Sequence, residues 1–142
     1  MAITNGLCVS FKKELFEGTH NFSTSGGDTF KLALYTSAAT LGPATTAYTA
    51  TDEVVGAGYS GGGATLTNAG IGYNASEAWV DFQDLTFANS TITARGALIY
   101  NSTQSNKAVA VIDFTTNQTT SNSNFTIQFP AAAGGSAIVR IT

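Results

Sequence analysis

Short runs of alternating hydrophobic and polar residues repeat along most of the chain. In the clearest run, residues 29–35, Phe30, Leu32 and Leu34 fall on one side of an extended backbone. This alternation predicts a half-buried strand. Similar runs rich in Thr, Val, Ile, Phe and Tyr follow at 64–73, 77–82, 85–88, 91–100, 108–114, 125–129 and 137–141. Clusters of Asn, Ser, Gly and Asp separate them, so the spacing predicts a mainly β fold, an antiparallel β-sandwich of jelly-roll or immunoglobulin-like type.

The run at 91–100 contains a candidate irregularity at the dipeptide Arg95–Gly96. We interpret Ile92 and Ala94 as lining up with Leu98 and Tyr100 only if this dipeptide absorbs a β-bulge. We therefore expect a bulge at this dipeptide.

The beginning of the chain follows a different period. Between residues 9 and 22, the apolar residues Phe11, Leu15 and Phe16 recur at helical spacing, with Lys and Glu on the other face. Ser10 is placed to cap the N-terminus of a helix, and Gly18 to end it. The pattern predicts one short N-terminal α-helix.

The segments between the helix and the later strands are rich in small residues. Residues 36–48 show little periodicity and predict a long surface loop, whereas residues 52–55 predict a short edge strand. Five glycines surround Tyr59, and such a segment is typical of a flexible loop. The glycine cluster has no Lys-Ser/Thr pair and opens no helix, so it does not indicate a phosphate-binding loop.

Composition limits the kinds of partner. The chain has 142 residues, a length typical of one domain, here residues 1–142 with a helical segment at 1–22 and the sandwich at 29–142. Only 11% of its residues are charged, and its net charge is -3. The six Lys and Arg residues are scattered, which argues against nucleic-acid binding, and no apolar run is long enough to span a membrane. We find no secretion signal and expect synthesis in a cytoplasm.

Candidate chemistry is sparse. Two of the carboxylates Glu77, Asp81, Asp84 and Asp113 could form a hydrolytic pair or bind calcium, but acidic residues at strand ends are commonly turn formers. We therefore expect no enzyme activity, no metal and no cofactor.

The single histidine and the single cysteine do not suggest a catalytic pair. We expect His20 to face solvent or the helix dipole, and Cys8, among Leu7, Val9 and Phe11, to be a buried and inert thiol. The aromatic residues Tyr59, Tyr73, Trp79 and Tyr100 could form a sugar-stacking platform, although aromatic residues in strands are more often part of the core.

Few charges and many Thr, Ala and Gly residues suit a surface that other protein covers, because desolvating Thr or Ala costs less than desolvating Lys or Glu. We expect an assembly protein. Its candidate contacts are residues of the helix and of the 36–63 loops, namely Phe11, Leu15, Phe16, Tyr48 and Tyr59.

Four segments resemble a known group of proteins. They are residues 28–37, 47–59, 92–100 and 106–114. They are similar to small proteins encoded in tailed-bacteriophage genomes, including phages of cyanobacteria and marine bacteria, and most like capsid decoration or cement proteins. The resemblance is a pattern of strands, and it transfers no functional residue.

The resemblance implies a β-sandwich on the outside of a phage capsid. It implies a homo-oligomer, a trimer at the symmetry axes between capsomers, bound to the major capsid protein. An alternative is a tail or baseplate component, an adhesin that binds host glycan through the four aromatic residues named above.

Overall fold

The computed structural model describes residues 2–130 and 137–141. Ten strands and one helix follow each other in the order β1 (Gly6–Leu7), α1 (Val9–Phe16), β2 (Phe30–Tyr35), β3 (Ala64–Thr65), β4 (Asn68–Tyr73), β5 (Ala78–Phe82), β6 (Leu85–Ser90), β7 (Thr93–Asn101), β8 (Lys107–Thr119), β9 (Ser123–Ile127) and β10 (Val139–Ile141). All paired strands are antiparallel. The prediction of a mainly β chain with antiparallel sheets and one short helix is confirmed.

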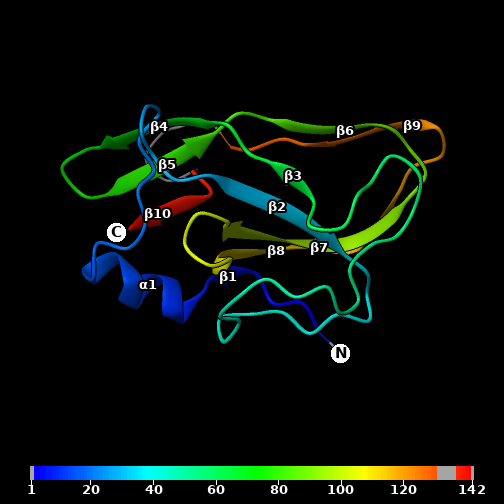
Figure 1. Cartoon of the computed structure of the whole chain (residues 1–142), viewed down its shortest axis with the longest axis horizontal. Helices are drawn as coiled ribbons and strands as arrows, with labels where there is room; N and C mark the ends of the chain where they lie inside the picture. Colours follow the sequence, from blue (N-terminus) through cyan, green and yellow to red (C-terminus); the bar gives the residue numbers. More distant parts are fainter. Residues whose placement is uncertain (1, 131–136, 142) are drawn as a thin grey trace.

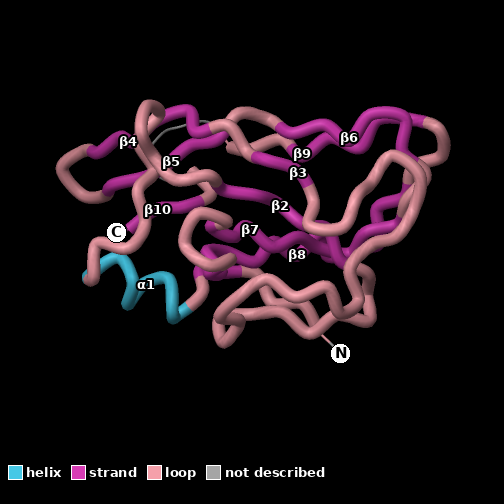
Figure 2. The backbone as a smooth tube through the Cα atoms, viewed as in Figure 1, coloured by secondary structure: helices cyan, strands magenta, loops and turns pink. Residues whose placement is uncertain are grey.

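The strands form three sheets, which lie in two layers (Figure 1). The first layer is a five-stranded sheet in the order β1-β8-β7-β2-β3. The second layer contains a three-stranded sheet, β10-β5-β4, and a two-stranded sheet, β6-β9. The tube drawing in Figure 2 shows that long loops close the side of the molecule next to the N-terminus, while α1 lies below β10 and β8. This arrangement is consistent with a β-sandwich-like fold.

Aromatic rings fill the space between the layers. Phe30 of β2 stacks on Phe22 with a centroid distance of 4.3 Å, and Phe82 of β5 lies 5.8 Å from Phe30. Phe87 of β6 and Phe125 of β9 continue this row in the two-stranded sheet. These residues fall on the apolar side of their strands, so alternation in the sequence correctly identified the core face.

Strand β2 differs from its prediction. We expected it to be half-buried, but both of its faces are covered, because the 36–63 loops pack on the face opposite the second layer. The Tyr35 hydroxyl donates to the carbonyl of Thr49 at 2.7 Å, and the Val54 amide donates to the Leu34 carbonyl at 2.9 Å. Gly63 brings these loops back to the sheet: its φ is +76°, and a Cβ there would lie 1.8 Å from the Leu32 carbonyl oxygen.

The register shifts where we predicted a bulge, but the extra residues lie in the partner strand and not at Arg95–Gly96 itself. The register between β7 and β8 shifts between Ala94 and Gly96: Gly96 faces Asp113, whereas Ala94 faces Gln118. The extra residues belong to β8, where residues 114–117 lie opposite Arg95 alone. The bulge bends β8 away from β7.

Three local predictions were wrong. Ser10 does not cap α1: the N-cap is Cys8, without a side-chain hydrogen bond, and the Ser10 hydroxyl donates to the Thr45 carbonyl instead. Residues 52–55 form no strand but only an isolated bridge between Glu53 and Tyr35. The run at 64–73 is two strands, β3 and β4, because they pair in different layers.

Candidate functional site

The three-stranded sheet projects beyond the core and leaves part of its inner face open. Paired residues of antiparallel strands point to the same face, so the row Ile71, Val80 and Val139 continues the inner face that begins at the buried Phe82. The next row outward consists of Tyr73, Ala78 and Ile141. Ile71, Tyr73 and Ile141 are 61%, 84% and 55% exposed. The end of this sheet is thus an apolar surface without core beneath it.

Helix α1 lies opposite this open sheet end. Its residues Phe11 and Leu15 are four positions apart and therefore share one helix face. Phe11 is fully buried, and Leu15 is half-buried against the core. Phe16 lies one position further around the helix and is 95% exposed. The helix thus anchors itself with Phe11 and presents Phe16 beside the sheet.

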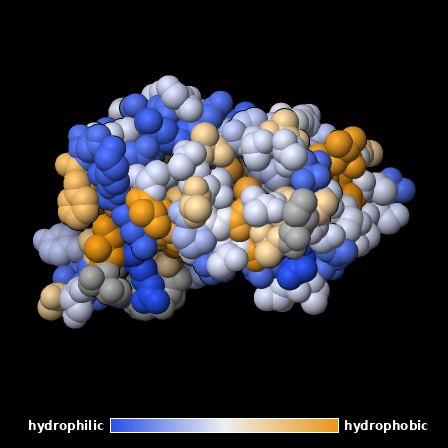
Figure 3. All heavy atoms as spheres, turned by 90° about the horizontal axis from the view of Figure 1, so that it is seen from below, coloured by the Kyte–Doolittle hydropathy of each residue, from blue (hydrophilic) through white to orange (hydrophobic). Residues whose placement is uncertain are grey.

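A groove runs between the helix and the sheet; we call it the α1 groove. One part, of about 430 Å³, is lined by Leu7, Lys12, Leu15, Phe16, Arg140 and Ile141. A second, smaller part shares Leu15, Arg140 and Ile141 and reaches Ile71 and Ala78. Seen from below, hydrophobic and strongly hydrophilic groups lie side by side at the end of the molecule that carries α1 (Figure 3). Exposed apolar residues gathered at one groove mark an interaction surface more often than scattered ones do.

Charges of both signs border the α1 groove. Arg140 lies 3.6 Å from Glu77, and Lys13 lies 2.9 Å from Glu17. Lys12 adds one positive charge to the lining. The border therefore has no strong net charge, and it would not repel a second copy of the same surface.

Tyr48 and Tyr59 do not belong to this groove. Both hydroxyls donate to the carboxylate of Glu53, at 2.6 Å from Tyr48 and 2.5 Å from Tyr59. The same carboxylate accepts the Gly62 amide at 2.8 Å, and the Tyr59 hydroxyl accepts the Leu34 amide at 2.9 Å. Burial, followed by the hydrogen bond to Glu53, raises the pKa of Tyr48 to about 12 and raises the pKa of Tyr59 further. These two residues fasten the 36–63 loops to β2.

Of the five candidate contacts, the structure brings Leu15 and Phe16 together at an open surface. Phe11 has no exposed surface with which to touch a partner, because it anchors the helix. Ile71, Tyr73 and Ile141 were missed as candidates. Their strands show ordinary alternation, and only the projection of the sheet beyond the core distinguishes them from core residues.

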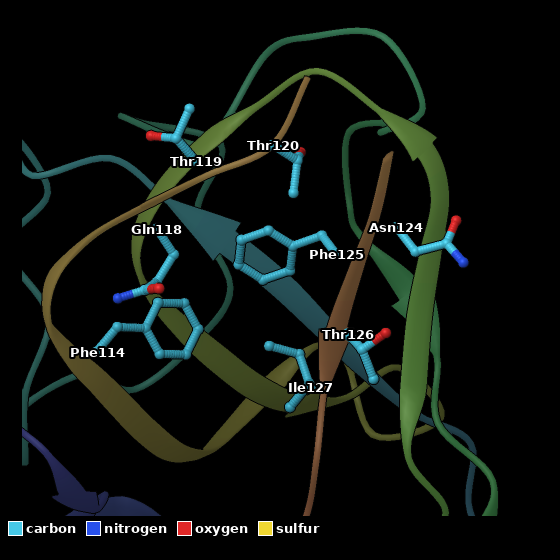
Figure 4. A pocket seen from close by; sticks show the side chains of 8 residues that line it. All are labelled: Phe114, Gln118, Thr119, Thr120, Asn124, Phe125, Thr126 and Ile127. Atoms are coloured by element: carbon cyan, nitrogen blue, oxygen red, sulfur yellow. The ribbon is translucent and has the colours of Figure 1, made fainter. Parts of the chain in front are cut away.

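The seam between β8 and β9 contains a second hollow, of about 260 Å³ (Figure 4). Phe114, Phe125 and Ile127 form its floor, and Gln118 and Thr120 lie on its rim. No local pattern in the sequence indicates this site, because its residues come from β8 and β9, which belong to different sheets and do not pair with each other.

The candidate acids are dispersed. Glu77 pairs with Arg140, Asp113 lies 3.2 Å from Arg95, and Asp84 accepts the Phe129 amide at 2.9 Å. Within residues 2–130 and 137–141, His, Cys, Asp and Glu form no group of three or more that could hold a metal ion.

The prediction that His20 faces solvent or the helix dipole was wrong. Its side chain is fully buried, 3.0 Å from Glu14 Oε1 and 3.0 Å from Asn101 Nδ2. Asn101 Oδ1 accepts the amides of Thr103 and Gln104, so its Nδ2 must donate to His20 Nδ1. The proton of the neutral ring is then on Nε2, which donates to Glu14.

Cys8 is a free, fully buried cysteine, as predicted. Burial, and then the nearby Glu14 charge, raises the pKa of its thiol to about 11. A thiol with so high a pKa is poorly reactive at neutral pH.

Two of the four rings proposed as a sugar platform are unavailable. Tyr100 is buried, and its hydroxyl donates to the Gly62 carbonyl, while Tyr59 is held by Glu53. Tyr73 is exposed at the sheet end, and the Trp79 ring packs over Gly72. These rings do not form one surface.

The fold defines the class of this protein: a mainly β chain of antiparallel sheets with one short helix. Comparisons of the chain with protein-family models, with curated proteins and with solved structures find no match. In the part of the chain that the structure describes, no helix has the length and apolar character needed to cross a membrane.

Proposed function

We propose that this chain is a structural subunit that binds a second copy of itself through the α1 groove and decorates the outside of a bacteriophage head. The observation that supports the assembly role is Phe16, which is 95% exposed beside an open apolar groove. Burying one such side chain is worth about 1.5–3 kcal/mol. A partner that covers this surface therefore gains substantial free energy.

The choice of a second copy as the partner rests on the surface itself. A protruding phenyl ring and an apolar hollow of about 430 Å³ lie next to each other, so one surface offers both parts of a contact. The charges at its border are mixed in sign, which suits a surface meeting its own copy. A partner with strong net charge would find little electrostatic complement here.

The capsid role rests on the resemblance of four segments to phage decoration proteins and on the low charge of the chain. A decoration protein has no turnover. It stabilises the shell by binding only the assembled state, and many weak contacts sum through multivalency. The resemblance further suggests a trimer and a contact with the major capsid protein.

The self-association is tested by comparing Phe16→Ser with Val55→Ser. Both residues are 95% exposed, but Val55 does not line the α1 groove. A symmetric dimer buries two Phe16 rings per contact, so their removal weakens association by at least about 100-fold; a trimer buries one ring per head-to-tail contact, and the loss is at least about tenfold per contact. We expect light scattering to give an oligomer for the wild type and Val55→Ser, and a monomer for Phe16→Ser. A monomeric wild type would refute this contact, and the mass of the oligomer tests the trimer.

The capsid role is tested by counting copies in purified particles of the phage whose genome encodes the chain. Hundreds of copies on the head support decoration, whereas a few dozen or fewer on the tail support the alternative, a tail adhesin. The adhesin role is the weaker proposal, because Tyr59 and Tyr100 are engaged inside the fold.

A further inference from the structure

The hollow between β8 and β9 is built by an irregularity that the sandwich does not otherwise need. Residues 114–117 of β8 bulge away from β7, and Thr115 takes a φ of +65° to make this turn. On the other side of the hollow, one edge of β9 pairs with β6 and its other edge pairs with no strand of the described residues. The bulge in β8 and the unpaired edge of β9 leave an open seam between these two strands.

The floor of this seam is aromatic. Phe114, from the bulge, and Phe125, from β9, lie with ring centroids 6.1 Å apart and a 50° angle between their planes. Figure 4 shows the two rings next to each other, with Ile127 beside them. Phe114 is half-buried and supplies the more accessible ring, whereas Phe125 is 7% exposed. Phe125 is also held by the core ring of Phe87, which keeps the floor rigid.

The rim is polar, and none of the eight residues that line the hollow is charged. The Gln118 amide lies beside the Phe114 ring (Figure 4), where its Nε2 donates to Thr116 Oγ1 at 3.0 Å. This bond orients the amide and leaves Gln118 Oε1 able to accept from a ligand. Thr120 Oγ1 lies 2.8 Å from the Ser90 hydroxyl and is likewise held in place.

We propose that this pocket binds one neutral sugar ring. A pyranose has an apolar C–H face, which matches the aromatic floor, and hydroxyl groups around its perimeter, which match an amide and hydroxyl rim. The volume of about 260 Å³ lies just below the roughly 300–1,000 Å³ of pockets for drug-sized ligands, so it suits a single ring and not an added β-strand of several residues. An uncharged lining gives charged ligands no counter-ion.

This site is independent of the proposed assembly contact. The β6-β9 sheet lies at the end of the molecule opposite α1 (Figure 1). Sugar binding and self-association can therefore succeed or fail separately.

The experiment is a titration of the isotope-labelled protein with glucose, galactose, mannose and N-acetylglucosamine, in which NMR records the backbone amide chemical shifts. We expect at least one of these sugars to give saturable shifts confined to residues around 114–127. We expect Gln118→Ala to weaken this binding about three- to tenfold, which is the effect of losing one hydrogen bond. Gln128→Ala is the matched control: Gln128 is also exposed but does not line the pocket, so binding should be unchanged. Phe114→Leu keeps an apolar floor without the ring and should also weaken binding.

Three results would overturn the proposal. The first is the absence of saturable shifts with all four sugars. The second is equal binding of glucuronate, which would show that the uncharged lining does not select. The third is a perturbation of the same amides by an extended Thr-Val-Thr-Val-Thr peptide but by no sugar, which would indicate strand addition at β9.

Discussion

Replacing Glu53 tests whether one carboxylate holds the 36–63 loops on the sheet. Glu53 accepts hydrogen bonds from Tyr48, Tyr59 and the Gly62 amide. In Glu53→Ala these three donors lose their common acceptor, and two of them are tyrosine hydroxyls whose pKa values are raised by burial. Glu53→Gln keeps the size of the side chain and one acceptor oxygen.

The expected magnitude follows from these contacts. A hydrogen bond to a charged group contributes about 1.5–3 kcal/mol, and a partly exposed site lets water replace part of what is lost. We therefore expect Glu53→Ala to lower the free energy of unfolding by about 3 kcal/mol and Glu53→Gln by about half as much. For a chain of this size, the larger loss corresponds to a fall in Tm of roughly 10 °C.

Urea unfolding monitored by circular dichroism measures these values. Glu17→Ala is the control, because the Lys13–Glu17 pair is exposed and screened by water, so its loss should change stability little. A double-mutant cycle with Tyr59→Phe should give a coupling energy of about 1–2 kcal/mol. The reasoning is refuted if Glu53→Ala costs no more than Glu17→Ala, or if Tyr59→Phe has the same effect with and without Glu53.

Three further predictions concern buried groups. Folding raises the pKa of Tyr48 from about 10 to about 12, so folding favours the neutral hydroxyl. The free energy of unfolding should therefore hold below pH 10 and fall between pH 10 and 12, less steeply in Tyr48→Phe. An unchanged urea midpoint across that range would contradict this prediction. His20→Ala should lower the free energy of unfolding by about 3–4 kcal/mol, because it leaves a cavity and removes the partner of Glu14 and Asn101. Urea unfolding measures this loss, and Thr24→Ala, a change at an exposed position, is the control that should lower it hardly at all. Cys8 should react with a disulfide reagent at pH 8 far more slowly in the native protein than in urea; equal rates would contradict its burial.

Local pattern was enough to predict most of the strands, because alternation with period two reflects which face of a strand is buried. Gly18 correctly marked the region where α1 ends, two residues after Phe16. These features depend on residues close together in the sequence.

His20, Glu53 and Phe16 could not be interpreted in this way. His20 is buried because Asn101, eighty-one positions away, reaches its ring, and local pattern cannot show a contact between residues so far apart. Glu53 lies only five and six positions from Tyr48 and Tyr59, but this segment has no regular period, so its sequence does not show that the two hydroxyls meet the carboxylate.

The sequence by itself therefore determined the class of fold, the core face of the strands and the low charge of the surface. Only the tertiary structure decided which apolar residues remain outside the core. Phe11 and Phe16 have similar chemistry and lie on one helix, yet the first is buried and the second is 95% exposed. The difference arises because the three-stranded sheet projects past the core, and with α1 it forms a groove that residues 2–130 and 137–141 leave open.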